Sequence, residues 1–242
     1  HQNTESIKTT IDTVLSLDPD RLALYHYAHL PHIFKPQRRI DTNVVPGSEE
    51  KLDMLQYCVQ TLTERGYVFI GMDHFAKPDD ELSIALKEGF LQRNFQGYST
   101  YADCDLVAIG VSSIGKIGST YSQNERDIDA YYAALNAGHL PIMRGYQLNQ
   151  DDILRRNIIQ DLMCRFSLDY QIYESVFGIP FSRYFAAELE DMKQLETLGL
   201  VRLKPHSLTV TPKGRFLIRN IAMVFDYHLR HKETKAKYSQ TV

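Results

Sequence analysis

The sequence has few cysteines, no tryptophan and no long apolar run. Cys58, Cys104 and Cys164 are an odd number at wide spacing, which excludes a disulfide framework and a CxxC-type metal site. No stretch approaches the roughly 18 consecutive apolar residues of a membrane-spanning helix, so a membrane span is excluded. Because a basic and apolar leader is also missing, these features together predict a protein of the reducing cytoplasm.

Charge of one sign does not dominate either. The 242 residues contain 27 Lys/Arg and 30 Asp/Glu, and 43% of them are hydrophobic, a composition typical of globular proteins with one large domain or two smaller ones. Residues 1–150 carry 13 Lys/Arg against 19 Asp/Glu, whereas residues 151–242 carry 14 against 11. This change of sign is weak evidence for a domain boundary near residue 150, and the basic excess is too small for a nucleic-acid-binding stripe.

Helical and strand patterns alternate in the first part of the chain. Apolar residues at helical spacing predict helices over residues 6–17, 50–65 and 80–89. Short apolar runs predict strands over residues 21–28, 67–72 and 106–112. This order favours βαβ units with parallel strands. Because three buried parallel strands cannot cover their own edges, we expect an incomplete sheet that a partner chain or an N-terminal stretch outside this sequence would complete. The start at His1 favours the second explanation.

From Asn149 the pattern becomes mainly helical. Asn149 is a good helix N-cap, and further helices are expected near residues 171–177 and 181–198. A hairpin should follow over residues 199–211, turning through residues 204–206, and Pro212 should open a last helix that runs to about residue 229. The sequence therefore predicts a winged-helix-like domain over residues 149–231 and a flexible tail over residues 232–242.

Several candidate ligand-binding residues lie just after the predicted strands. The runs Tyr25–His29, Met72–His74 and Val111–Gly115 could converge on one pocket, since ligands of such sheets bind at the carboxyl ends of strands. Metal binding is considered for His26, His29, His32 and His74, but ordinary structural histidines are the favoured interpretation. His26 and His29 would face opposite sides of a strand, which weakens them as a ligand pair.

Other segments have both a functional and an ordinary interpretation. The run Gln92–Thr100 could place a phenylalanine ring and an amide over a planar ligand, or could be a simple connector. The glycines of Gly110–Gly118 could offer backbone NH groups to an anion, although the run matches no phosphate-binding fingerprint. Lys35–Arg39 and Arg93 could hold carboxylates of an acidic substrate, but a solvated loop face is favoured. Cys58 is expected to pack inside a helix.

Long motifs point to one family. They are Tyr27–Pro31, Gly71–Ala76 with Pro78–Leu82, Arg93–Tyr98, Gly110–Ser112 and Lys213–Asn220. Together they resemble the oxygen-independent coproporphyrinogen III oxidases of bacterial haem biosynthesis, and the resemblance runs from about Ile7 to Val242. Those enzymes are radical S-adenosylmethionine (SAM) enzymes, which bind a [4Fe-4S] cluster through a CxxxCxxC loop together with two SAM molecules. The resemblance covers the C-terminal half of such an enzyme.

The resemblance implies an α/β fold in two parts. Residues 1–148 would be the C-terminal portion of a partial (βα)6 radical SAM barrel, carrying loops for the second SAM and the substrate, and residues 149–231 the helical domain. The parent enzyme would decarboxylate two propionates of coproporphyrinogen III to vinyl groups, which yields protoporphyrinogen IX. This sequence has no CxxxCxxC, so the cluster cannot be built here, and the chain by itself is expected to be inactive.

The resemblance also assigns individual residues. Ala28 would contact the cluster-bound SAM through its backbone, Ile114 would contact the second SAM, and Phe95 and Gln96 would lie beside that second molecule. A phenylalanine face can pack on an adenine, and an amide can both donate and accept hydrogen bonds. Asp73 and His74 would line the pocket without an assigned role. No catalytic residue and no metal ligand is assigned within this chain.

The expected partner is coproporphyrinogen III, with no nucleic acid and no membrane. The parent is expected to be a monomer, whereas the apolar strand edge around residues 22–27 predicts self-association of this chain. One alternative is a haem-binding or haem-trafficking relative, although the Arg93–Tyr98 motif is more typical of the oxidase. Another is a winged-helix regulator of nucleic acids, but the helix over residues 182–198 has a net charge of −2, the wrong sign for phosphate contacts.

Overall fold

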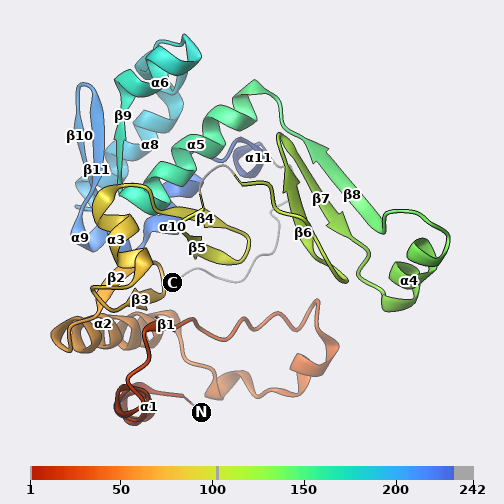
Figure 1. Cartoon of the computed structure of the whole chain (residues 1–242). Coiled ribbons are helices and arrows are strands. Elements are labelled where there is room, and N and C mark those ends of the chain that lie inside the picture. The colour runs from red at the N-terminus through yellow and green to blue at the C-terminus, as the bar shows by residue number, and fades with distance from the viewer. Residues whose placement is uncertain (1, 102–103, 232–242) are drawn as a thin grey trace.

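The computed structural model describes residues 2–101 and 104–231, so the tail predicted over residues 232–242 lies outside the described residues (Figure 1). Helices and strands alternate in an α/β arrangement. The helices are α1 (Thr4–Ser16), α2 (Ser48–Glu64), α3 (Glu81–Glu88), α4 (Ile128–Asn136), α5 (Gln150–Arg165), α6 (Tyr170–Phe177), α7 (Phe181–Tyr184), α8 (Ala186–Thr197), α9 (Pro212–Phe216), α10 (Ile218–Met223) and α11 (Tyr227–Arg230), with short 3₁₀ helices η1 (Lys35–Arg39) and η2 (Thr42–Val44). The strands are β1 (Arg21–Ala23), β2 (Val68–Gly71), β3 (His74–Ala76), β4 (Gln92–Asn94), β5 (Gly97–Ser99), β6 (Ile114–Ile117), β7 (Thr120–Asn124), β8 (Ile142–Gln147), β9 (Ser167–Asp169), β10 (Val201–Lys204) and β11 (Ser207–Val210).

The N-terminal part is a small sheet with two helices. Its strand order is β1-β3-β2, and α1 and α2 contact each other beside it (Figure 1). The buried residues at this junction are Ile11, Cys58, Leu62, Tyr67 and Phe75. Every helix predicted here is present within about two residues of its expected bounds, because each one buries an apolar stripe at helical spacing. Cys58 is buried in this cluster, which confirms its predicted packing role.

The prediction of parallel strands is wrong for the residues described, in which every paired strand runs antiparallel to its neighbour. The reason is local. Strands β2 and β3 are joined through Met72 and Asp73, and Met72 has a left-handed φ of 53°, so the chain reverses at once and no crossover helix intervenes. The strand predicted over residues 106–112 is reduced to an isolated bridge between Leu106 and Lys116, since Gly110 (φ 96°) and Ser112 (φ 59°) interrupt any extended backbone.

The helical part is built around α5. Asn149 caps it, and a reciprocal capping box with Asp152 confirms the predicted start. The hairpin β10–β11 turns where it was predicted, and β9 pairs with β11. The helix predicted over residues 181–198 is interrupted at Phe185, whose fully buried ring packs between Phe181 and Phe225. The last predicted helix is likewise divided into α9, α10 and α11. No helix in the described ranges is long and apolar enough to cross a membrane.

Sequence patterns missed a third part of the fold. The antiparallel sheet β6-β7-β8 with α4 extends away from the helical part, and the β4–β5 hairpin points toward it (Figure 1). These strands are short and polar, for example Gln92–Asn94 and Thr120–Asn124, so they lack the apolar runs by which strands were sought. They pair with other short strands, β4 with β5 and β7 with β6 and β8, and only the tertiary structure reveals this pairing.

The cysteines differ sharply in their surroundings, which predicts their reactivity. Burial raises the pKa of the Cys58 thiol to about 11 and that of Cys164 to about 12, whereas Cys104 is exposed. We expect one thiol to react rapidly with an aromatic disulfide reagent at pH 8 in the native chain, and all three in denaturant. Cys104→Ser should remove the fast reaction. Rapid labelling of Cys58 or Cys164 in the folded Cys104→Ser chain would contradict the described packing.

Candidate functional site

The β4–β5 hairpin presents two of the predicted site residues. Asn94 pairs with Gly97, so Phe95 and Gln96 form the turn between the strands. The Gln96 NH donates to Asn94 Oδ1 at 2.8 Å, and Gly97 has a φ of 131° that favours glycine. The Phe95 side chain is 55% exposed although it is a large aromatic group. The hairpin therefore holds an aromatic ring and an amide at an exposed tip.

Tyr98 fixes the hairpin to the protein. Burial raises the pKa of Tyr98, so its phenol stays protonated and donates to the carbonyl of Met163 at 3.0 Å. The Arg93 guanidinium lies over the Tyr98 ring, 5.5 Å from its centroid. A Cβ at Gly71 would lie 2.5 Å from Tyr98 Oη, so the β2 backbone approaches the phenol closely. Arg93 Nε is buried and has no hydrogen-bond partner among the described residues, so its role as a carboxylate ligand stays a prediction.

Asp73 and His74 pack against the same β4–β5 turn. His74 Nδ1 lies 2.7 Å from Asp73 Oδ1, and the His74 ring meets the Tyr98 ring edge to face at 5.2 Å. A Cβ at Gly97 would lie 3.3 Å from His74 Nε2, so the imidazole packs directly against the turn. These contacts give Asp73 and His74 a supporting position for which the sequence offered no role.

The sheet β6-β7-β8 carries another predicted residue, Ile114. Directly paired residues of antiparallel strands point to the same side, and side chains alternate along each strand. One side of the sheet, here called the inner sheet face, therefore presents six side chains from the three strands: Ile114, Lys116, Tyr121, Gln123, Arg144 and Tyr146.

The hairpin tip meets the inner sheet face. The Phe95 and Tyr121 rings are in edge contact, with centroids 5.4 Å apart and planes at 80°. Tyr121 pairs with Lys116, two positions along β6 from Ile114. The tertiary structure thus places Phe95 and Ile114 around a shared surface, although they are 19 positions apart in the chain.

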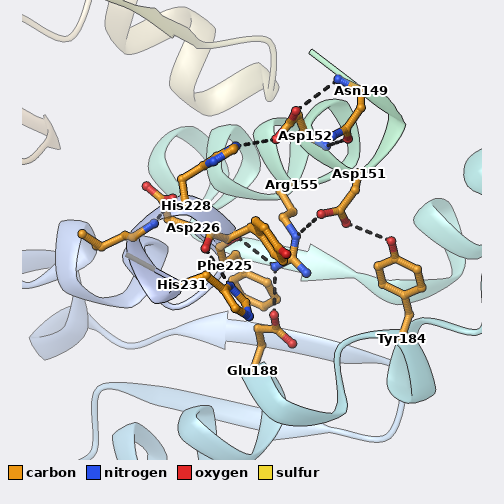
Figure 2. A network of polar contacts seen from close by, with 12 residues as sticks. Asn149, Asp151, Asp152, Arg155, Tyr184, Glu188, Phe225, Asp226, His228 and His231 are labelled. Carbon is orange, nitrogen blue, oxygen red and sulfur yellow. Dashed lines mark hydrogen bonds and ion pairs between the residues drawn. The ribbon is translucent and has the colours of Figure 1, made fainter. Parts of the chain in front are cut away.

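Tyr146 ties the same face to the helical part. Its hydroxyl lies 3.1 Å from Asp152 Oδ2 and 3.3 Å from His228 Nε2. His228 Nε2 in turn lies 2.7 Å from Asp152 Oδ1, as Figure 2 shows for Asp152 and His228. Burial alone would raise the pKa of Asp152, but hydrogen bonds from the Asn149 NH, His228 and Tyr146 outweigh it and lower the pKa below its ordinary 3.8.

This lowered pKa makes the contact of Asp152 with Tyr146 and His228 depend on pH. The stabilisation by the Asp152 carboxylate is complete above pH 3.8 and is lost as the pH falls through the lower pKa of the folded state. We expect Asp152→Asn to lower the free energy of unfolding by about 1–3 kcal/mol at pH 7, with the deficit shrinking below pH 4. Urea unfolding at several pH values measures it, with exposed Asp12→Asn as the control. A deficit that does not change with pH would contradict the assignment.

Ala28 lies in a different segment, the long connection between β1 and α2. The Gln37 side chain donates to the Ala28 carbonyl at 3.0 Å, and the Gln37 carbonyl lies 3.2 Å from His29 Nε2. Leu24 NH donates to Asp73 O at 2.7 Å, so the connection starts beside the β2–β3 turn. The described contacts of Ala28 do not join it to the hairpin tip or to the inner sheet face.

Three NH groups of the glycine-rich run already have partners within the protein. Gly110 NH donates to Tyr131 Oη at 3.1 Å, Ser112 NH to the carbonyl of Glu125 at 2.7 Å, and Gly118 NH to Asp105 Oδ1 at 2.7 Å. The anion-binding alternative considered for Gly110–Gly118 is therefore wrong for these three groups. Their hydrogen bonds instead hold the loop against the sheet.

The cysteines do not form a cluster-binding set. Cys58 and Cys164 are buried in two different hydrophobic cores, and Cys104 is exposed. Across residues 2–101 and 104–231, no group of three or more His, Cys, Asp or Glu side chains is arranged to hold a metal ion.

Tyr98, Tyr121 and Tyr146 were missed as site residues by sequence reasoning. Tyr98 is the last residue of the Arg93–Tyr98 motif, so the family resemblance could have identified it. Tyr121 and Tyr146 lie in polar stretches, and their place on the inner sheet face depends on strand register, so no local pattern identifies them.

Known proteins resemble this chain throughout its length. Residues 148–217 match the family model described as the HemN C-terminal domain. Oxygen-independent coproporphyrinogen III oxidases are 48% identical in Pseudomonas aeruginosa (94% of this chain, 50% of that protein) and 45% identical in Escherichia coli K12 (100% and 53%). The relative from Thermostichus vulcanus is 45% identical over 96% of this chain and 72% of its own length. The chain thus spans about half the length of the first two relatives.

A solved structure shows the same fold. The coproporphyrinogen III oxidase HemN of Escherichia coli, described as a radical SAM enzyme, matches with a TM-score of 0.90 and 46% identity over 94% of this chain and 52% of that one. The α/β fold is therefore one found in a radical SAM enzyme. Within that class, the chain belongs to the oxygen-independent coproporphyrinogen III oxidase family.

Proposed function

We propose that this chain contributes the second-SAM and substrate-facing surfaces of an oxygen-independent coproporphyrinogen III oxidase. The observation that carries the proposal is the meeting of Phe95, at the hairpin tip, with Tyr121 on the sheet face that also bears Ile114. In the whole enzyme each of two propionates would lose a hydrogen atom to a radical derived from SAM, one electron to a one-electron acceptor outside this chain, and CO2, and would become a vinyl group. Such an enzyme works in haem biosynthesis with coproporphyrinogen III as substrate.

The residues present fit a SAM molecule at the hairpin tip. Phe95 offers an exposed ring for an adenine, Gln96 an exposed amide, and Ile114 an apolar contact on the facing sheet. Tyr98, His74 and Asp73 hold the turn in place, so the tip is preorganised. SAM with a reduced [4Fe-4S] cluster supplies radical hydrogen abstraction in this class, and the cluster ligands would come from outside this chain. Ala28 would contact the cluster-bound SAM through its backbone.

We also propose the finer architecture. Residues 1–148 would complete a partial (βα)6 barrel supplied mainly from elsewhere, and residues 149–231 would form a winged-helix-like domain. Three features support the second statement: the helices around α5, the β10–β11 hairpin and the short helices that follow it. The whole enzyme would be a monomer, whereas this chain alone would self-associate through the exposed edge of β1. Light scattering that finds only monomers at tens of micromolar would contradict the self-association.

The activity can be tested in a chimera. This chain would replace the matching 52% of the Escherichia coli enzyme, which supplies the remaining sequence. After anaerobic reconstitution with iron and sulfide, we expect conversion of coproporphyrinogen III with SAM cleavage. Gln96→Ala should strongly reduce turnover, while Gln56→Ala, at an exposed position of α2, should not. A reconstituted chimera that binds haem and leaves coproporphyrinogen III unchanged would contradict the proposal and favour a haem-trafficking role.

A further inference from the structure

Two cations on the inner sheet face have no anionic partner among the described residues. Arg144 is exposed, and its Nε donates to Gln123 Oε1 at 2.9 Å, which orients the guanidinium and leaves its terminal nitrogens free of described contacts. Lys116 Nζ has no hydrogen bond or ion pair with any residue in the described ranges. By contrast, Arg155 forms ion pairs and Arg215 lies over the Phe166 ring.

The positions of these cations follow from the strand register. Lys116, Tyr121 and Tyr146 form one row across the three strands, and Ile114, Gln123 and Arg144 form the next. Lys116 and Arg144 therefore occupy opposite corners of the grid, about 12 Å apart from the spacing of strands and residues. The other side chains of the inner sheet face are Ile114, Tyr121, Gln123 and Tyr146.

This arrangement matches a flat ring system with carboxylates at its rim. Aromatic and aliphatic side chains pack against a macrocycle, while guanidinium and ammonium groups bind carboxylates by charge-assisted hydrogen bonds. The exposed Phe95 ring contacts the same surface at Tyr121, on its central strand. Two cations are too few for a nucleic-acid backbone, and the aromatic residues between them would be unused by a simple anion.

We propose that Arg144 and Lys116 bind propionate carboxylates of the tetrapyrrole substrate as it lies on the inner sheet face. The inference rests on the proposed function and deepens it, because it names the side chains that select a polycarboxylate macrocycle. Arg144 makes the stronger contact, since its guanidinium is oriented in advance by Gln123.

The first test measures binding to the chain itself. The probe is coproporphyrin III, the stable oxidised form of the macrocycle, titrated by its absorbance at low and at high salt. Arg144→Gln keeps a donor for Gln123 Oε1 but removes the charge, and should weaken binding about tenfold, with a similar loss for Lys116→Gln. Arg202→Gln, an exposed strand arginine on the β10–β11 hairpin, is the matched control and should bind normally. A porphyrin without propionates should bind weakly to every variant.

The second test separates this inference from the proposed function. In the chimera, Arg144→Gln should raise the KM for coproporphyrinogen III more than it lowers kcat, whereas the control Arg202→Gln should leave both KM and SAM cleavage unchanged. An inactive chimera would count against the proposed function alone if coproporphyrin III still binds with the expected loss in Arg144→Gln. An unchanged affinity and KM in Arg144→Gln and Lys116→Gln, or no binding by the wild-type chain, would overturn the inference.

Discussion

Gly214→Ala is expected to destabilise the fold by about 3 kcal/mol or more. Gly214 lies in the first turn of α9, where a Cβ would overlap the carbonyl oxygen of Leu200 and lie 2.9 Å from Val210 Cγ1. The Leu200 carbonyl cannot move away cheaply, because it accepts a hydrogen bond from the Thr211 NH at 2.9 Å. The Cβ that alanine adds at this position would therefore clash with a hydrogen-bonded backbone carbonyl and not with the end of a flexible side chain.

Urea unfolding followed by circular dichroism measures the loss at Gly214. Gly47→Ala is the control, since its Cβ would meet no atom within 4 Å, and it should cost less than about 1 kcal/mol. If Gly214→Ala unfolds within about 1 kcal/mol of the wild type, the close approach of α9 to Leu200, just before β10, is not as described. Gly214 lies in the Lys213–Asn220 motif, so this packing also explains why a glycine stands there.

Arg155→Ala is expected to cost about 3–5 kcal/mol, because it leaves a buried carboxylate without its partner. Arg155 Nη1 lies 2.8 Å from Glu188 Oε1, and its Nε lies 2.8 Å from Asp151 Oδ2 (Figure 2). The same Nη1 donates to the Phe225 carbonyl at 3.2 Å, and the guanidinium lies 5.1 Å from the Phe185 ring centroid. The Arg155 and Glu188 side chains are both buried, so water cannot replace the contacts that Glu188 would lose.

A double variant tests this reasoning about Arg155. Arg155→Met combined with Glu188→Leu removes both charges and keeps apolar volume, so it should be much less destabilising than Arg155→Ala alone. The surface pair Arg230–Asp191 provides the comparison, since Arg230→Ala should cost less than about 1 kcal/mol. A double variant as unstable as the sum of Arg155→Met and Glu188→Leu would show that the two side chains do not act as a pair.

Periodicity and capping residues predicted the helices well where both signals were local. Helix α5 starts at its predicted Asn149 cap, and the β10–β11 hairpin turns at residues 204–206 as expected. The same reasoning wrongly predicted parallel strands. Met72 has a left-handed backbone conformation within an apolar run, and the chain reverses direction there. The reasoning also missed the break between α7 and α8 at Phe185, whose burial depends on rings from α7 and from the segment before α11.

The candidate site depended more strongly on tertiary structure. Phe95, Gln96 and Ile114 were assigned through the family resemblance, and their contacts with a ligand stay predictions. Their meeting through Tyr121, the support of the turn by His74 and the cations on the inner sheet face follow only from strand register and long-range packing. The sequence by itself determined helices α1, α2, α3 and α5 and the family, since periodicity, capping residues and motifs all involve residues that are close along the chain. Tertiary structure alone decided which side chains share a surface, because antiparallel pairing joins residues that no local pattern connects.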